Sequence, residues 1–401
     1  MRGWLLFPLC ALFTVTGADA QWVHLSGPQG AYAFTVNGPN IYAGSFGQGV
    51  FVSTDEGSDW TAVDSGLTST DVFALASSGT YLYAGTFLGG LFVSSNGGVS
   101  WAASDSGFST ANVISLATYG SDVLAGTYGN GLFISADSGA VWAPTQVRNV
   151  SVYAFAAVGP GICAGTYGGG VFLSASGDTS WGGMDSGLTA KNVLALASVG
   201  STVFAGTLGG GMFRSTNAGA NWTADDSGLT VLTVNALISV GTIVFAGTDV
   251  GVFRSTDMGM SWAPVDSLLP ATPVYAFAAT GTNLFAGTNG RGIWRRPLSQ
   301  VVITDVAAAR GAVPGAFALE QNYPNPFNPS TTIRYSIPRQ SHVTLTVFSI
   351  LGQQVATLIS AQQVPGYHEF RFDASGLASG VYFYRLTAEG YTSTRKLLLL
   401  R

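Results

Sequence analysis

The chain has 401 residues, of which 47% are hydrophobic, 9% are charged and 54 are glycine. Such a composition, with many aromatic residues and few charges, is typical of all-β proteins with many tight turns. The net charge is -5 and no basic run is present, so the electrostatic basis of nucleic-acid binding is missing.

The first twenty residues have the features of a signal peptide. Arg2 supplies a positive charge, residues 4–15 form an apolar run, and the Ala-Asp-Ala of residues 18–20 fits a cleavage site, so we expect the mature chain to begin at Gln21. The apolar run is short for a membrane span, and no later segment is a better candidate for one. After cleavage Cys163 is the only cysteine, which predicts no intrachain disulfide.

The body of the chain is a repeat. The tripeptide Ala-Gly-Thr or Ala-Gly-Ser occurs seven times at intervals of 39 to 41 residues, with its glycine at Gly44, Gly85, Gly126, Gly165, Gly206, Gly247 and Gly287. Each unit predicts four short strands separated by turns, which in the second unit are residues 72–77, 81–86, 91–95 and 100–104. Four strands in such a period form a blade of a β-propeller.

The two ends of the repeat complete one another. Seven sets of the first three strands are present, but only six tryptophan-bearing fourth strands follow them, and the last set ends at Trp294. Residues 21–26 look like a fourth strand and precede the first set. We therefore predict an all-β, seven-bladed β-propeller over residues 21–298, closed by its N-terminal strand, with Trp22 beside Trp262 and no unpaired edge.

A pattern, Ser-x-Asp-x-Gly-x-x-Trp, lies between the third and fourth strands. Its Asp or Asn and its Trp are Asp55 and Trp60, Asn96 and Trp101, Asp137 and Trp142, Asn217 and Trp222, and Asp257 and Trp262, while the fourth copy keeps Trp181 without the pattern's Asp and Gly. The pattern resembles the Asp-box of the BNR repeat, found in sialidases and in photosystem assembly-factor propellers. Because Asp and Asn accept backbone N–H groups at turns and Trp packs into apolar layers, we expect these residues to be structural.

The resemblance to sialidases implies an arginine cluster and a Tyr–Glu nucleophile pair, which the sequence does not supply. Glu56 is the propeller's one glutamate and lies in an Asp-box turn, on the face opposite the usual ligand face, while only Arg148 and Arg291 fall in loops of the ligand face. His24 is the only histidine before the tail, which argues against His-based metal sites and Ser-His-Asp triads. We expect no enzyme, no metal and no cofactor.

A glycoside hydrolase is the alternative, and it depends on aspartates. Several recur in Asp-Ser-Gly turns, and a residue that the repeat places in several blades is typical of a turn former: Asp64, Asp105, Asp185 and Asp226. Asp249 breaks the repeat in a shortened loop, residues 248–251, and is the single catalytic candidate for chemistry that uses two carboxylates.

The loops between the second and third strands share the ligand face. Directly after the repeated tripeptide stand Phe46, Phe87, Tyr128, Tyr167, Leu208, Asp249 and Asn289, and Arg291 follows in the last loop. Four neighbouring blades thus offer rings that either stack a sugar or grip a peptide, or else fill gaps between blades. We expect a monomeric, non-catalytic propeller that binds a glycan, peptide or protein, with an assembly or scaffold role as a further alternative.

Residues 299–316 predict a linker, and the strands of residues 317–401 predict an antiparallel Ig-like β-sandwich. The tail resembles the type A C-terminal sorting domain of type IX secretion, with a FlgD-like immunoglobulin fold. The residues that carry the resemblance are Asn322, Tyr323, Pro324, Asn325, Pro326, Phe327, Asn328, Pro329, Leu351-Gly352-Gln353, Ser379-Gly380-Val381-Tyr382 and Lys396. The resemblance implies export through the periplasm and the outer-membrane secretion machinery of a Gram-negative bacterium, followed by release or surface attachment. The alternative is a structural accessory module.

Overall fold

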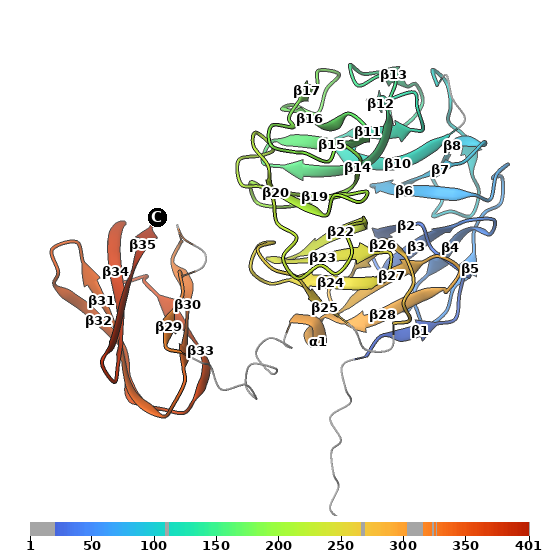
Figure 1. Ribbon diagram of the computed structural model, residues 1–401. Coiled ribbons are helices and arrows are strands. Elements are labelled where there is room, and N and C mark those ends of the chain that lie inside the picture. Colours follow the sequence, from blue (N-terminus) through green and yellow to red (C-terminus); the bar gives the residue numbers. More distant parts are fainter. Residues whose placement is uncertain are drawn as a thin grey trace, which may run out of the picture. The chain divides into compact units, whose positions relative to one another are not determined.

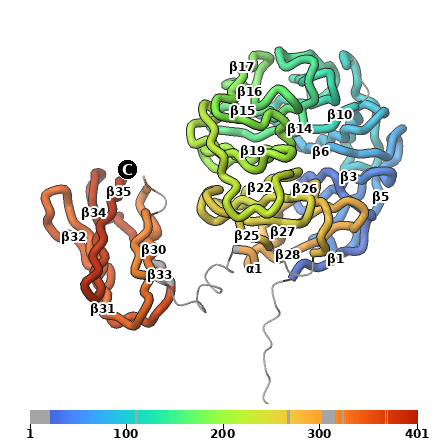
Figure 2. The backbone as a smooth tube through the Cα atoms, in the orientation of Figure 1, coloured from blue at the N-terminus to red at the C-terminus, as the bar shows by residue number. Residues whose placement is uncertain are grey.

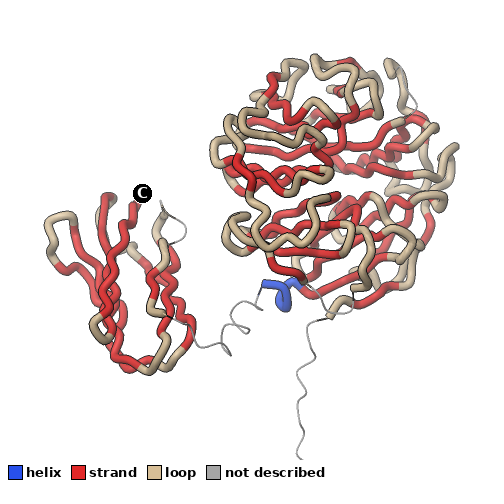
Figure 3. Tube along the Cα trace, in the orientation of Figure 1, coloured by secondary structure: helices blue, strands red, loops and turns tan. Residues whose placement is uncertain are grey.

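The computed structural model describes residues 21–108, 112–265, 269–302, 316–322, 325 and 327–400. The expected signal peptide, most of the expected linker, and Tyr323, Pro324 and Pro326 of the expected sorting motif lie outside these residues. The chain divides into two compact units, residues 1–301 and 302–401. Strands dominate the described part of both units (Figure 3).

The described part of the first unit forms seven four-stranded antiparallel sheets, numbered here as blades 1 to 7. Blades 1 to 3 consist of β2 (Ala33–Asn37), β3 (Asn40–Ser45), β4 (Gly49–Ser53) and β5 (Thr61–Ala62); β6 (Val72–Ser78), β7 (Tyr81–Thr86), β8 (Gly90–Ser94) and β9 (Ala102–Ala103); and β10 (Val113–Tyr119), β11 (Asp122–Thr127), β12 (Leu132–Ser135) and β13 (Ala143–Pro144). Blades 4 to 6 consist of β14 (Ser151–Val158), β15 (Gly161–Tyr167), β16 (Gly170–Ser174) and β17 (Gly182–Gly183); β18 (Val193–Val199), β19 (Thr202–Thr207), β20 (Met212–Ser215) and β21 (Thr223–Ala224); and β22 (Val234–Val240), β23 (Ile243–Thr248), β24 (Gly251–Ser255) and β25 (Ala263–Pro264). The strands of these blades pair in chain order (Figure 1).

Blade 7 combines both ends of the repeat region. Its strands are β26 (Val274–Ala279), β27 (Asn283–Thr288), β28 (Ile293–Pro297) and, as the fourth, β1 (Val23–Leu25). β1 is antiparallel to β28, with Leu25 opposite Ile293 and Val23 opposite Arg295, and the two strands lie side by side in the backbone trace (Figure 2). The N-terminal strand is therefore hydrogen-bonded to the last strand of the repeat.

The first strands of the blades surround the axis of a closed ring. They contact one another in the order β2, β6, β10, β14, β18, β22, β26 and again β2. The second strand of a blade lies between the first and third strands and is buried along its length in β19, whereas buried and half-buried residues alternate in the first strand β26. This alternation is expected of a strand with one face toward a channel.

The glycine of the repeated tripeptide lies where two blades approach one another. A Cβ on Gly85 would stand 2.7 Å from a methyl carbon of Val113, on the first strand of the next blade. Gly206 has the same relation to Val234, at 2.6 Å. A side chain at these positions would push the blades apart, which explains why the repeat retains glycine within a strand.

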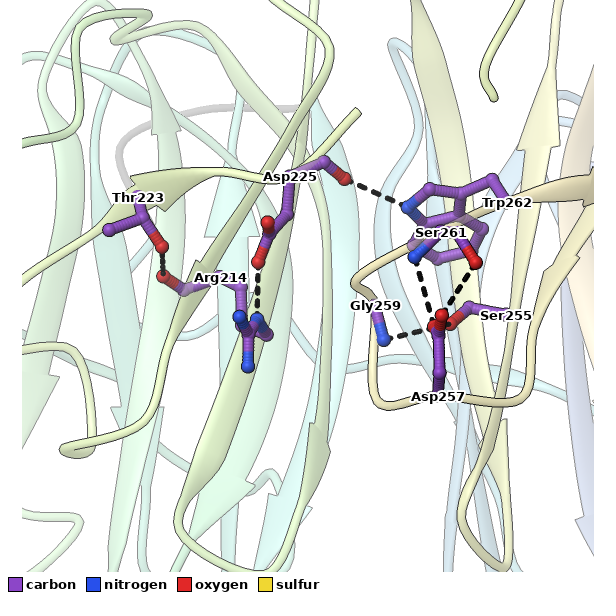
Figure 4. A network of polar contacts seen from close by, with 8 residues as sticks. All are labelled: Arg214, Thr223, Asp225, Ser255, Asp257, Gly259, Ser261 and Trp262. Atoms are coloured by element: carbon purple, nitrogen blue, oxygen red, sulfur yellow. Dashed lines mark hydrogen bonds and ion pairs between the residues drawn. The ribbon is translucent and has the colours of Figure 1, made fainter. Parts of the chain in front are cut away.

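Most of the tryptophans link their blade to the one before it, whereas the indoles of Trp60 and Trp181 donate within their own turns. The Trp262 indole N–H donates to the backbone carbonyl of Asp225 at 2.9 Å, three residues after the tryptophan of blade 5 (Figure 4). Trp22 repeats this contact across the junction of the ring, since its indole donates to the carbonyl of Val265 at 2.9 Å. Trp22 is 1% exposed and therefore contributes to the core as the tryptophans of complete repeats do.

In the turns between the third and fourth strands, side chains form hydrogen bonds with backbone groups of the same turn. In blade 6 the Ser255 hydroxyl accepts from the Gly259 N–H and donates to Asp257, whose carboxylate accepts from the Ser261 N–H at 2.9 Å (Figure 4). Burial opposes ionisation of Asp257, but the hydrogen bonds from Ser261 and Ser255 outweigh it and lower its pKa. The same serine-to-acid or serine-to-amide bond occurs at Asp55, Asn96, Asp137 and Asn217.

The fourth copy of the turn keeps an aspartate at a shifted position. Asp178 accepts from Ser174 Oγ at 3.4 Å and from the Ser180 N–H at 2.7 Å, and its carbonyl accepts from the Trp181 indole at 2.8 Å. In this copy the aspartate stands four residues after the serine instead of two, so the fixed spacing of the sequence pattern does not detect it.

The second unit is a sandwich of two antiparallel sheets. One sheet has the order β29-β30-β33 and the other β32-β31-β34-β35. Ile333, Leu345 and Leu386 belong to the buried cluster between them. The strands are β29 (Ala318–Leu319), β30 (Ser330–Ile337), β31 (Ser341–Ser349), β32 (Gln354–Gln363), β33 (Gly366–Asp373), β34 (Gly380–Ala388) and β35 (Tyr391–Leu399).

The first residues of the expected linker, residues 299–316, are helical in the structure. Residues 299–302 belong to helix α1 (Leu298–Val302), whose Leu298 and Val301 are buried in one cluster with Trp22. The Arg254 guanidinium also donates to the carbonyl of Val301. These contacts fix the end of the first unit at Val301 rather than at residue 298. Across the described residues, no helix has the length and apolarity needed to cross a membrane.

Candidate binding site at the mouth of the propeller channel

A cavity of about 550 Å³ lies at the axis of the ring. Each of the seven blades contributes to its lining one residue at the same place in or just before its first strand: Tyr32, Phe73, Ile114, Tyr153, Leu194, Asn235 and Tyr275. The remaining lining is alanine, leucine and phenylalanine, with Ser115, Phe87 and Tyr128. Among the described residues, the lining contains no Asp, Glu, Lys, Arg or His.

Tyr32 is the centre of an aromatic cluster at this cavity. Its ring stacks on Tyr275 with centroids 5.1 Å apart, meets Phe73 edge-on at 5.4 Å, and lies 6.3 Å from Phe46. Phe73 in turn lies 6.0 Å from Phe87. Each such pair contributes about 0.5–1.5 kcal/mol beyond burial, so the cluster holds blades 7, 1 and 2 of the mouth in a defined arrangement.

The predicted loop aromatics divide into exposed and partly buried rings. Phe46, Tyr128 and Tyr167 are 57%, 55% and 47% exposed, whereas Phe87 is half-buried in the cavity wall. Tyr167 lies 6.3 Å from Tyr153 of the channel. Three of the four rings thus offer an open face beside the cavity and do not fill a gap between blades.

A polar sector occupies blades 6, 7 and 1 of the mouth. The Asn235 amide donates to Asp249 Oδ1 at 2.9 Å, and the Tyr32 hydroxyl donates to Asn289 Oδ1 at 2.8 Å. Burial and the nearby charge of Asp249 raise the pKa of Tyr275, and burial together with Tyr275 raises that of Tyr32. These phenols remain neutral hydrogen-bonding groups at physiological pH.

The other charged candidates lie apart from the cavity lining. Arg291 is exposed, and its backbone carbonyl accepts from the Trp294 indole at 2.8 Å. Among the Asp-Ser-Gly turns, the Asp64 carbonyl accepts from the Leu67 N–H at 3.0 Å, and Asp185 forms an ion pair with Lys191. Among the described residues, no group of three His, Cys, Asp or Glu side chains could hold a metal ion.

Sequence reasoning missed the channel residues themselves. All seven stand twelve residues before the glycine of the repeated tripeptide, as Tyr32 precedes Gly44 and Asn235 precedes Gly247. Their column reads Tyr, Phe, Ile, Tyr, Leu, Asn and Tyr, and the lack of a shared residue type hides it among the strand residues. Aligning the units on their glycines would have found it.

The sorting motif predicted in the tail lies against the last strand. Asn325 accepts from the Leu398 N–H at 2.8 Å and donates from its amide to the Lys396 carbonyl at 3.1 Å. The backbone of Phe327 bonds to Leu398 and Leu400, both at 3.0 Å. The motif therefore fastens the C-terminal strand β35 to the body of the sandwich.

Residues 321–400 match the family described as the secretion system C-terminal sorting domain. The second unit is thus a sorting domain of type IX secretion, and the tail marks the chain as one that is exported to the cell surface or beyond. Comparison of the sequence with curated proteins gives no match.

Solved structures resemble the chain at low sequence identity. YCF48, in a structure described as bound to D1 peptide, is 16% identical with a TM-score of 0.58, covering 69% of this chain and 96% of that chain. PorZ, a surface component of the type IX secretion system of Porphyromonas gingivalis, is 17% identical with a TM-score of 0.52, covering 94% and 60%. The GH74 xyloglucanase from Xanthomonas campestris is 19% identical with a TM-score of 0.52, covering 79% and 59%. These likenesses establish the propeller fold, which serves here both an enzyme and proteins described by other roles.

Proposed function

We propose that the chain is an exported binding protein whose propeller holds its ligand at the mouth of the central channel. The observation that carries the proposal is the set of exposed rings, Phe46, Tyr128 and Tyr167, beside an apolar cavity of about 550 Å³. Concave apolar sites with a few placed polar groups are the usual ligand sites of proteins. Rigid aromatic side chains that are open to solvent supply most of the binding energy at such sites.

Binding is favoured over glycoside hydrolysis by the chemistry of the mouth. Hydrolysis of this kind uses two carboxylates, about 5–10 Å apart, on either side of the bond to be cleaved. The mouth presents Asp249 bonded to Asn235, and the described cavity lining supplies no carboxylate to pair with it. A binding role is also consistent with YCF48, whose structure is described as holding a peptide.

The mouth can be tested with a glycan array and a peptide array probed with the secreted chain. We expect capture of one ligand class, and we expect Tyr128→Ala and Tyr167→Ala each to lower it, because each removes an open ring. Tyr81→Ala is the matched control, since Tyr81 is 38% exposed at the start of β7, at the end of the blade opposite the mouth loops. Capture that is equal in all variants, with thermal unfolding unchanged, would remove the mouth as the binding site.

Delivery by the tail is a second part of the proposal. We propose that the second unit engages the outer-membrane secretion machinery, because its residues 321–400 match the family of secretion system C-terminal sorting domains. A reporter fused to residues 299–401 should reach the medium or the cell surface in a host that carries the system. A reporter that stays in the periplasm of that host would contradict this part, with a host lacking the system as the control.

A further inference from the structure

The mouth is divided into an apolar cavity and a polar rim, and this division carries information about the ligand. We infer that the ligand is a peptide segment that inserts an apolar side chain into the channel and places a positively charged group beside Asp249. The inference rests on the proposed binding function and adds the class of ligand to it.

The cavity suits an apolar group. Its lining has two polar side chains other than tyrosine: the Ser115 hydroxyl donates to the Val152 carbonyl at 2.6 Å, and the Asn235 amide nitrogen donates to Asp249, which leaves the Asn235 oxygen at the rim. The Tyr32 hydroxyl donates to Asn289. A sugar ring inserted here would bury several hydroxyl groups, for which the described lining offers chiefly the tyrosine hydroxyls as partners, whereas an aromatic or branched aliphatic side chain needs none.

The rim suits a cation. Asp249 is exposed, its Oδ1 accepts from Asn235, and no hydrogen bond joins its Oδ2 to another described residue. Tyr275 lies near enough for the charge of Asp249 to act on it. A lysine or arginine side chain beside Asp249 would meet a carboxylate and an aromatic ring together, which is a favourable combination for a cation. Arg291, in the neighbouring loop of blade 7, is exposed and carries a positive charge, so the proposed cation would bind on the Asp249 side of the mouth.

The rim also suits a peptide backbone. Asn235 of blade 6 and Asn289 of blade 7 present primary amides at the mouth: the Asn235 nitrogen donates to Asp249, and the Asn289 oxygen accepts from Tyr32. The Asn289 amide nitrogen and the Asn235 amide oxygen therefore form a donor and an acceptor for main-chain groups of an extended segment. Apolar cavity, cation site and amide pair together fit a peptide better than a neutral glycan.

The probes for the test are a bead library of random dodecapeptides and an array of neutral glycans, both presented to the secreted chain. We expect captured peptides to be enriched in an aromatic or branched aliphatic residue within a few positions of lysine or arginine. For such a peptide, Asp249→Asn should raise Kd about two- to fivefold at low salt, because Asp249 is exposed. The same variant should leave unchanged the Kd of a matched peptide in which the cation is replaced by glutamine, because only the ion pair is removed.

The outcomes separate the inference from the function on which it rests. Capture of glycans without peptides, lowered by Tyr128→Ala, would overturn the peptide assignment and leave the mouth as a binding site. Enrichment of acidic or charge-free peptides, or equal Kd values for Asp249→Asn and the unaltered chain, would overturn the cation site. Capture that ignores Tyr128→Ala, or no capture by either library, would overturn the binding function as well.

Discussion

At the scale of single residues, Glu56 shows how a turn of blade 1 is hydrogen-bonded to blade 7. It belongs to the Asp-box turn of blade 1, yet its carboxylate accepts from Thr280 at 2.8 Å, Thr282 at 3.2 Å and Asn283 at 3.0 Å, all in blade 7. The Arg295 guanidinium donates to the Glu56 carbonyl at 2.5 Å. The propeller's single glutamate is thus placed at the junction where the ring closes, and it stabilises that junction.

This arrangement makes the junction sensitive to pH. Burial opposes ionisation of Glu56, but the three hydrogen bonds and Arg295 outweigh it and lower its pKa from 4.5. Because the folded-state pKa is the lower one, the stabilisation is complete above pH 4.5 and is lost as pH falls through the folded value. Glu56→Gln should therefore lower the free energy of unfolding at pH 7 by at most about 1 kcal/mol, since the group is partly exposed. Below pH 4.5 the unfolding free energy of the variant should fall less than that of the unaltered chain, because the variant has no carboxylate to protonate at this position.

Urea unfolding at pH 7 and pH 3.5 measures the effect of Glu56→Gln. The control is Asp59→Asn, which removes an exposed carboxylate of the same turn that contacts no residue of blade 7 in the described hydrogen bonds. An unchanged pH profile for Glu56→Gln would show that the carboxylate does not stabilise the junction.

At the scale of elements, the N-terminal strand carries more stability than its three residues suggest. β1 supplies the fourth strand of blade 7, and Trp22 beside it is buried with Val265, Val301 and Leu284 in one cluster. Without this segment β28 would have an unpaired edge, and the hydrogen bond from the Trp22 indole to the Val265 carbonyl would be missing at the junction.

Deletion of residues 21–27 should therefore destabilise the whole ring. The milder change Trp22→Ala should lower the free energy of unfolding by about 3–5 kcal/mol. Val23→Ala is the control, because Val23 is 50% exposed in the same strand, and we expect a change within about 0.5 kcal/mol. Thermal unfolding of the deletion variant at the temperature of the intact chain would contradict closure by β1.

The same scale shows what the sequence can and cannot predict. The blades were predictable because Gly85 and its equivalents recur where neighbouring blades approach closely, and a tryptophan recurs just before the fourth strand of each complete unit. The channel lining was not, because Tyr32, Ile114 and Asn235 share a position without sharing a chemistry. Helix α1 escaped prediction because five residues are too few to show a helical period, and its position depends on burial of Leu298 and Val301.

At the scale of the whole molecule, the two units have different features. The sorting domain matches a family defined by export, and its motif residues contribute to its own C-terminal strand. The propeller repeats one blade design around a ring, and the repeat breaks where the ligand face becomes asymmetric: aromatic at blades 1 to 4 and polar at Asp249 and Asn289. Such asymmetry on a repetitive scaffold is what a specific binding site requires.

The most direct measurement of the central claim is the Kd of the captured ligand for three forms of the chain, by isothermal titration. We predict that Tyr128→Ala raises Kd about tenfold or more, as the loss of an exposed aromatic anchor does. Tyr81→Ala makes the same substitution in blade 2, at the end of the blade away from the mouth, and should leave Kd within about twofold of the unaltered chain. Equal Kd values for Tyr128→Ala and the unaltered chain, or a larger loss for Tyr81→Ala, would contradict binding at the channel mouth.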